Sequence, residues 1–204
     1  MEPNQNFLTM PATLVFATNN QHKLEEVAAK TGNQLQLLSL TDINCTDDIA
    51  ETGTTFRENA SIKSRYIFNK YNLNCFGDDS GLEVEALNNE PGVYSARYAG
   101  THGNHEANIN KVLQNLQGQS NRKARFRTVI SLMWKGKEHF FEGTVDGAIR
   151  EEKAGTDGFG YDPIFEPEGY SITFAEMTME EKNSISHRAI AMEKLIAFLK
   201  EQAD

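Results

Sequence analysis

The feature that most constrains the fold is a long alternation of apolar and polar residues in the second half of the chain. The alternation runs from residue 124 to residue 134 and continues from 141 to 145, after Lys135 and Gly136. Because the side chains of a strand point alternately to its two faces, this pattern predicts two long strands joined as a β-hairpin. We expect the hairpin to form part of a central sheet.

Strand and helix patterns are interspersed in the rest of the chain, which indicates an α/β fold. Short apolar runs at residues 12–17 and 35–38 predict buried strands. Apolar residues at helical spacing predict helices near residues 24–28, 55–71, 109–116 and 187–199. We therefore expect a long mixed sheet with helices around it.

The composition restricts the class of partner. The 204 residues suit a single domain, residues 1–204, in which residues 1–11 are expected to form a loose N-terminal extension. A net charge of −9 disfavours a nucleic-acid polymer as the partner. The sequence contains neither an apolar run of about 18 residues nor a signal-peptide pattern, so we expect no membrane interaction and a cytoplasmic location. Two cysteines are too few for a disulfide framework or a zinc site.

An acidic stretch between two apolar runs is the first candidate site. Asp78, Asp79 and Ser80 lie between Gly77 and Gly81, and we expect them at a turn that separates two strands. Such a turn needs no function, because Asp, Ser and Gly are common turn residues. If the backbone is extended, however, the two carboxylates point to opposite faces, and one of them suits a hard cation such as Mg²⁺. A second acidic ligand would then come from elsewhere in the chain.

A run of polar residues ends the first predicted strand and begins the first predicted helix. The run consists of Thr18, Asn19, Asn20, Gln21, His22 and Lys23. The N-terminus of a helix can bind an anion through its backbone N–H groups and its dipole. Asn20 could instead serve only as the helix cap. Lys23 favours the anion site, because a cation in the first turn opposes the dipole unless an anion is bound nearby.

Lys63 is a second candidate for anion binding. It lies on the same helical stripe as Phe56, Ala60 and Ile67, so we expect its side chain on the inward face of the helix. The side chain could run along the apolar surface to reach water. We favour a phosphate-binding role, because an inward ammonium group beside a cleft is well placed to neutralise a phosphate.

A glycine-rich motif at residues 155–165 is a candidate for binding a flat ligand. Its three glycines surround Phe159 and Tyr161. Glycine allows the backbone to approach a ligand closely while an aromatic ring stacks on it. The alternative is a glycine-rich turn whose aromatic side chains fill the core.

The start of the C-terminal helix gathers several hydrogen-bond donors. Ser186 is expected to cap this helix, and His187 and Arg188 occupy its first turn, where the dipole disfavours cations. With Lys182 just upstream, these donors suit either a phosphate or the carbonyl oxygens of a base. His102 and His105, by contrast, are interpreted as surface residues.

Six motifs resemble those of the Ham1 family, the inosine triphosphate pyrophosphatases, and in particular its bacterial dITP/XTP pyrophosphatases. Each motif alone is weak, but all six occur in the order of the family and cover about residues 13–199. They lie at residues 18–23, 51–60, 78–82, 95–98, 158–163 and 186–188. The resemblance implies a Ham1-like fold with two lobes around a central substrate cleft, and a homodimer.

The resemblance also implies an activity and a set of site residues. The activity is hydrolysis of the non-standard purine nucleotides ITP, dITP and XTP to the monophosphate and pyrophosphate with Mg²⁺, which cleanses the nucleotide pool. Glu51 and Asp79 would bind the metal, and Asp79 would also accept the proton of the attacking water. The phosphates would bind to Thr18, Asn19, Asn20, Gln21, His22, Lys23 and Lys63, with Ser80 touching the substrate. The purine would be enclosed by Phe159, Gly160, Tyr161, Asp162, Lys182, His187 and Arg188.

Under this resemblance His187 and Arg188 would recognise the base. Hydrogen-bond donors near the purine 6-position match the keto oxygen of hypoxanthine or xanthine. They do not match the amino group of adenine, and binding adenine would therefore leave a polar group unpaired, which costs binding free energy. The chain departs from the family pattern at two positions, Asn19 in place of glycine and Gly77 in place of alanine.

Two alternatives differ in function. A Maf-like pyrophosphatase would act on other modified nucleotides, and the purine-side motifs argue against it. A non-catalytic nucleotide-binding sensor would keep the binding pocket without catalysing hydrolysis. The presence of Glu51 and Asp79 argues against it, because a protein that only binds has less need of a metal and a base.

Overall fold

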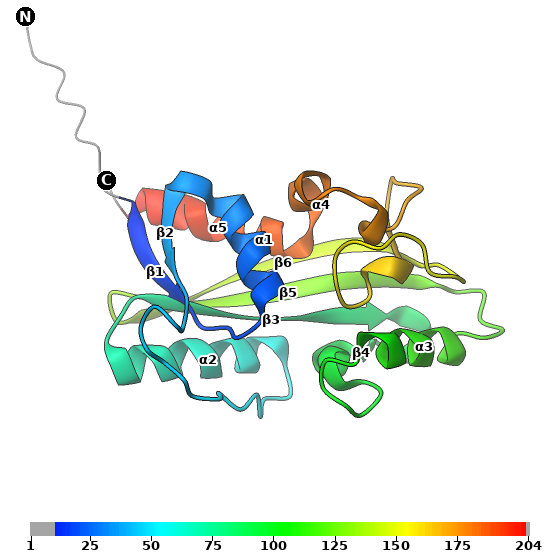
Figure 1. Ribbon diagram of the computed structural model, residues 1–204, viewed down its shortest axis with the longest axis horizontal. Helices are drawn as coiled ribbons and strands as arrows, with labels where there is room; N and C mark the ends of the chain where they lie inside the picture. The colour runs from blue at the N-terminus through cyan, green and yellow to red at the C-terminus, as the bar shows by residue number, and fades with distance from the viewer. Residues whose placement is uncertain (1–10, 203–204) are drawn as a thin grey trace, which may run out of the picture.

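A mixed seven-stranded sheet forms the centre of the protein, with helices on both of its faces (Figure 1). The computed structural model describes residues 11–202, so the expected N-terminal extension lies, apart from residue 11, outside the described residues. The strands are β1 (Ala12–Phe16), β2 (Leu35–Leu38), β3 (Cys75–Val84), β4 (Glu90–Pro91), β5 (Lys123–Trp134), β6 (Lys137–Ile149) and β7 (Phe165–Pro167). Within residues 11–202, every helix is too short or too polar to cross a membrane.

Five α-helices and several short 3-10 helices connect the strands. The α-helices are α1 (Gln21–Thr31), α2 (Phe56–Tyr71), α3 (His105–Asn115), α4 (Met179–Ile185) and α5 (His187–Glu201). The 3-10 helices are η1 (Gly32–Gln34), η2 (Glu85–Leu87), η3 (Gly92–Arg97), η4 (Asp162–Ile164) and η5 (Phe174–Glu176). The predicted α/β architecture with a mixed sheet is therefore confirmed.

The predicted hairpin is confirmed and forms the longest pairing of the sheet. β5 and β6 pair from Lys123 opposite Ala148 to Trp134 opposite Lys137. Lys135 and Gly136 connect them with φ angles of 48° and 80°. Two consecutive positive φ angles fit a tight hairpin turn whose twist matches that of the strands.

β3 corrects the expected turn at the acidic stretch. It is one continuous strand, paired with β5 from Cys75 opposite Met133 to Val84 opposite Ala124. The two glycines that suggested a turn instead permit close packing. A Cβ at Gly77 would lie 2.7 Å from the carbonyl oxygen of Ala60 on α2, and a Cβ at Gly81 would lie 2.4 Å from the carbonyl oxygen of Gly92. The acidic residues therefore lie in the middle of a strand.

The other edge of β3 is paired only at its ends. Parallel β1 pairs with it at Cys75 and Phe76, and antiparallel β4 pairs with it at Glu83 and Val84. Among the described strands, residues 77–82 have no partner on this edge. The gap between β1 and β4 gives the sheet an opening beside its acidic residues.

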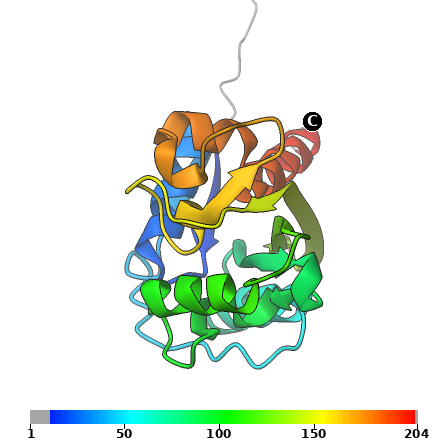
Figure 2. The same cartoon turned by 90° about the vertical axis from the view of Figure 1, so that its right-hand side faces the viewer.

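Helices cover both faces of the sheet. α2 packs on one face of β3 and β5, where the hydroxyls of Ser64 and Ser131 lie 2.7 Å apart. α5 packs on the opposite face of β5 and β6, as Figures 1 and 2 show. Ser186 caps α5 as predicted and accepts a hydrogen bond from the backbone N–H of Ala189, and Thr55 forms a capping box with Glu58 at the start of α2.

We predict that Gly81→Ala destabilises the fold, because its Cβ would meet the backbone of Gly92 and the hydroxyl of Ser95 at 2.4 Å. The free energy of unfolding should fall by about 1–3 kcal/mol, as is usual for overpacked sites. Urea denaturation measures this, and Thr144→Ala at an exposed position of β6 is the control, with an expected change within about 0.5 kcal/mol. An unchanged stability of Gly81→Ala would show that η3 moves freely away from β3.

Candidate active site

A cleft of about 710 Å³ lies at the unpaired edge of β3. Its walls come from the loop between β1 and α1, the first turn of α1, the loop before α2, α2 itself, β3, η3, the glycine-rich loop, α4 and the start of α5. The candidate residues that line it are Thr18, Asn19, Asn20, Lys23, Glu51, Lys63, Asp79, Ser80, Phe159, Gly160, Tyr161, Asp162, Lys182, His187 and Arg188. Residues far apart in the sequence thus meet in one cavity.

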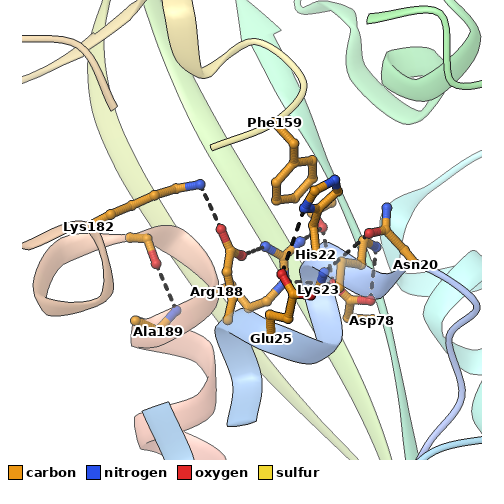
Figure 3. A network of polar contacts seen from close by, with 12 residues as sticks. Asn20, His22, Lys23, Glu25, Asp78, Phe159, Lys182, Arg188 and Ala189 are labelled. Carbon is orange, nitrogen blue, oxygen red and sulfur yellow. Dashed lines mark hydrogen bonds and ion pairs between the residues drawn. The ribbon is translucent and has the colours of Figure 1, made fainter. Parts of the chain in front are cut away.

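Two candidates lie outside the lining that the described residues form. Nε2 of Gln21 donates to Oε1 of Glu25 at 3.2 Å on the exposed side of α1. The ring of His22 stacks on Phe159, with centroids 5.2 Å apart (Figure 3). Both side chains lie in the first turn of α1 and are exposed, and their phosphate-binding role stays a prediction.

The start of α1 is capped as the simpler interpretation predicted. Oδ1 of Asn20 accepts from the backbone N–H of Lys23 at 3.2 Å, and the hydroxyl of Thr18 accepts from the backbone N–H of Asn20 at 3.1 Å. Nζ of Lys23 lies 2.9 Å from Oδ1 of Asp78, so a carboxylate already compensates the cation in the first turn. The N-terminus of α1 nevertheless borders the cleft, because residues 18–20 and Lys23 are part of the cleft lining.

The neighbouring acids of β3 have different surroundings because they point to opposite faces. Asp78 faces α1 and α5, where Nε of Arg188 lies 3.1 Å from its Oδ2. Burial opposes the ionisation of Asp78, but the charges of Lys23 and Arg188 outweigh it and hold the pKa of this carboxyl well below its usual range. Asp78 is therefore a fixed anion of the buried interior.

Asp79 faces α2 and lines the cleft. Its Oδ2 accepts from Nδ2 of Asn59 at 2.9 Å. Burial raises the pKa of Asp79, and the nearby Glu51 raises it further, whereas Lys63 and Lys23 oppose this. A carboxylate with a raised pKa that faces the cleft suits a general base.

Lys63 has the inward orientation that the helical stripe predicts. Its side chain is buried, and its ammonium group pairs with the carboxylate of Glu51. Burial opposes the charge of Lys63, but Asp78, Glu51 and Asp79 outweigh it and raise its pKa, so Lys63 remains a cation. The charge of Lys63 therefore faces the two candidate metal-binding acids.

A buried ion-pair network joins α1, α4 and α5. Glu26 accepts from Nζ of Lys182 at 2.6 Å and pairs with Arg188. Lys182 also donates to Oδ2 of Asp162 at 2.6 Å, and Nη2 of Arg188 donates to the hydroxyl of Ser80 at 2.7 Å. The Lys182 and Arg188 cations are thus held at the cleft by the acids behind them.

The two aromatic residues of the glycine-rich loop have different positions. Tyr161 fills the core, and Phe159 borders the cleft. Tyr161 is buried in the core, and its hydroxyl donates to the carbonyl oxygen of Ser95 at 2.8 Å. Phe159 is only partly buried and lines the cleft, with Nζ of Lys182 5.0 Å from its ring centroid. Oδ2 of Asp162 accepts from the backbone N–H of Phe159 at 2.8 Å and so fixes the loop. Phe159 alone of the pair is placed to stack on a ligand.

His187 is a buried polar group with spare bonding capacity. Its ring stacks on Phe126 with centroids 4.8 Å apart, and it lines the cleft. Nδ1 has no hydrogen-bond partner among residues 11–202. Burial, together with the charges of Arg188 and Lys182, holds the pKa of His187 well below its usual value, so the imidazole is neutral near pH 7.

The chain's sequence and fold match known proteins over nearly its whole length. A model of the Ham1 family matches residues 14–198. The chain belongs to the Ham1 family. A relative from Christiangramia forsetii, named dITP/XTP pyrophosphatase, is 54% identical over 186 residues, covering 91% of this chain and 98% of that protein. A relative of the same name from Flavobacterium johnsoniae is 51% identical, covering 91% and 97%.

Solved structures agree with this Ham1 assignment. The Staphylococcus aureus Ham1 protein superposes with a TM-score of 0.85 at 42% identity, covering 93% of this chain and 99% of that chain. A HAM1 protein from Coxiella burnetii gives the same TM-score at 40% identity, covering 93% and 99%. The expected Ham1-like α/β fold is therefore confirmed.

Several polar residues at this Ham1 site are not among the candidates predicted from the sequence. Glu26 and Asn59 are buried charged or polar residues on inward helix faces, and the sequence carries the same signal for them as for Lys63. His102 and His105 are exposed, as the sequence predicts, and they also line the mouth of the cleft. A search for polar residues on each apolar stripe would have found the first two.

The lowered pKa of His187 predicts a pH-dependent stability. Below about pH 6.5 His187 is protonated in the unfolded state, whereas its lowered pKa keeps it neutral in the folded state. The free energy of unfolding therefore falls as the pH falls. Between about pH 7 and pH 5.5 the free energy of unfolding of the wild type should fall by about 1 kcal/mol more than that of His187→Asn. Urea denaturation at both pH values measures the difference. Equal losses in the two proteins would mean that folded His187 titrates normally.

Proposed function

We propose that this Ham1-family protein is a nucleoside triphosphate pyrophosphatase that hydrolyses ITP, dITP and XTP to the monophosphate and pyrophosphate. The names of the relatives support this activity. The observation that carries it is the position of Asp79, a buried acid in a cleft that is lined by the cations Lys23 and Lys63 and also by Phe159 and His187. This arrangement suits a substrate with a triphosphate at one end and a planar base at the other.

The triphosphate is proposed to lie at the start of α1. Backbone N–H groups at the N-terminus of this helix and its dipole attract anions. The ammonium groups of Lys23 and Lys63 flank the position, each now paired with a carboxylate. Asn19 takes the position of the family glycine and lines the cleft, so its side chain also faces this end.

The proposed cofactor is Mg²⁺, bound by Glu51 and Asp79. Within residues 11–202, no group of three His, Cys, Asp or Glu side chains could hold a metal ion by itself. Two carboxylates nevertheless fit Mg²⁺, which takes its other ligands from water and phosphate oxygens. Burial raises the pKa of Asp79, and the charge of Glu51 adds a smaller repulsion that a cation would relieve. When bound, the ion would neutralise charge on the triphosphate and on the leaving pyrophosphate.

Asp79 is proposed to accept a proton from the attacking water. The water oxygen then forms a bond to phosphorus, and the bond between the α-phosphate and the pyrophosphate breaks. Lys23 and Lys63 stabilise the negative charge that passes to the pyrophosphate. The products are the nucleoside monophosphate and pyrophosphate.

The base is proposed to stack on Phe159 and to be read by His187. The donors of Arg188 and Lys182 already bind Glu26, Asp78 and Asp162, which limits their freedom to reorient. His187 lines the cleft, and its neutral ring carries one N–H group that can donate a hydrogen bond. A keto group at the purine 6-position can accept from this imidazole, whereas the amino group of adenine is mismatched.

Three further expectations remain predictions beside the proposed activity. We expect a single domain over residues 1–204, a homodimer and a cytoplasmic location, in line with the sequence and the family resemblance. A nucleic-acid polymer is disfavoured as partner by the net charge of −9.

The deciding experiment measures pyrophosphate release from ITP, XTP, GTP, ATP, CTP and UTP, with Mg²⁺ and with a chelator. We expect Mg²⁺-dependent release confined largely to ITP and XTP. Asp79→Asn should lower kcat by more than about 100-fold, because it removes the proton acceptor, while nucleotide binding persists. Nucleotide binding without pyrophosphate release from any substrate would favour the sensor. Pyrophosphate release mainly from CTP or UTP would favour the Maf-like alternative.

We predict that His187→Ala erodes base selection. The ratio of kcat/KM for ITP to that for ATP should fall about tenfold or more, because a hydrogen bond made only with the keto group is lost. His139→Ala is the control, since the ring of His139 also packs against a phenylalanine, Phe198, with ring centroids 4.4 Å apart and the rings tilted by 41°, but outside the cleft lining. A ratio that is unchanged in His187→Ala would assign base selection to another residue.

A further inference from the structure

Asn59 lies on the face of α2 that packs against β3, beneath the two candidate metal-binding acids. It is fully buried, with 0% exposure. Its Nδ2 donates to Oδ2 of Asp79 at 2.9 Å, and its Oδ1 accepts from the backbone N–H of Gly53 at 2.8 Å. The opposite amide orientation would set oxygen against a carboxylate and NH₂ against an N–H group. Both contacts together therefore fix the orientation of the amide.

The contact with Gly53 holds the loop that carries Glu51. A Cβ at Gly53 would lie 2.7 Å from Oδ1 of Asn59, so the loop rests directly on the helix. The next residues are also held, since Oε2 of Glu58 accepts from the backbone N–H of Thr54 at 2.7 Å. The start of α2 thus positions the backbone two residues after Glu51.

The contact with Asp79 holds the second acid. Oδ1 of Asp79 accepts from the backbone N–H of Ser80 at 2.9 Å, and Oδ2 accepts from Asn59. An ionised carboxylate offers about four lone-pair sites, so about two remain for a ligand. Without Asn59, Asp79 would keep only its bond to the adjacent backbone and would be free to rotate.

We propose that Asn59 is a positioning residue that keeps Glu51 and Asp79 at the separation a divalent cation requires. Lys63, one helical turn further along α2, binds Glu51 itself, so one face of this helix contacts both acids. Partners behind metal ligands orient them, and their loss typically costs 10–100-fold in affinity or activity. The inference rests on the proposed function, because the cation belongs to that reaction.

Two variants separate the contacts of Asn59. Asn59→Asp keeps an acceptor for Gly53 and replaces the NH₂ donor by a second carboxyl group, which repels Asp79 unless it binds a proton, whereas Asn59→Ala loses both contacts and leaves a polar space that water can fill. Ser64→Ala is the matched control, because Ser64 is equally buried on α2 and bonds to Ser131, away from the acids. Thermal unfolding establishes that each variant is folded at the assay temperature.

In both Asn59 variants we expect kcat for ITP to fall about 10–100-fold and the half-saturating Mg²⁺ concentration to rise about tenfold. KM for ITP at saturating Mg²⁺ should change less than about threefold, since Asn59 touches no substrate. Calorimetry with α,β-methylene-ITP should show weaker binding in the presence of Mg²⁺ and unchanged binding with a chelator. Ser64→Ala should match the wild type in each measurement.

Wild-type kcat and Mg²⁺ dependence in the folded Asn59 variants would overturn the proposal. Equal losses in Ser64→Ala, or unfolding of both Asn59 variants, would also overturn it, because Asn59 would then be a structural residue. If the wild type itself releases no pyrophosphate, the proposed function fails, and calorimetry decides the role of Asn59. Weaker Mg²⁺-dependent binding of the analogue would then support the positioning role, and unchanged binding would overturn it.

Discussion

The ion pairs of Arg188 connect the elements on which the cleft depends. Its guanidinium extends from the first turn of α5 to Glu26 on α1 and Asp78 on β3, and all three side chains are buried. A buried charge that loses its partner is strongly destabilising, so these elements must meet in one arrangement. Lys182 extends the same network to Asp162 in the glycine-rich loop. Charge pairing, in addition to apolar packing, therefore sets the walls of the cleft.

Successive side chains of β3 point to opposite faces, so that Asp78 belongs to the buried ion pairs and Asp79 to the cleft. On one face, Asp78 is held as an anion by Lys23 and Arg188. On the other face, Asp79 lies against α2 with a raised pKa and borders the cleft. Adjacent residues of the same type thus acquire opposite pKa shifts, because each face brings a different balance of burial and neighbouring charge.

Local patterns in the sequence predicted much of the fold and part of the site. The β5–β6 hairpin, the cap at Ser186 and the inward Lys63 each follow from the spacing of nearby residues, and the structure confirms them. The turn expected around Asp79 was wrong, because glycines required by packing look like turn glycines in a sequence. The pairing of Glu26 with Lys182 joins residues far apart in the chain and has no local signature.

The register between β3 and β5 has a consequence for how this protein can change over evolution. Asp79 lies opposite Val129, and Asp78 opposite Ile130. Inserting or deleting a single residue before Asp78 in β3 would turn every later side chain of the strand to the other face. Asp79 would then enter the buried cationic network and Asp78 the cleft, with Gly77 and Gly81 lost from their close contacts. Insertions are therefore tolerated in the surface loops and not in this strand, where a shift would remove stability and activity together.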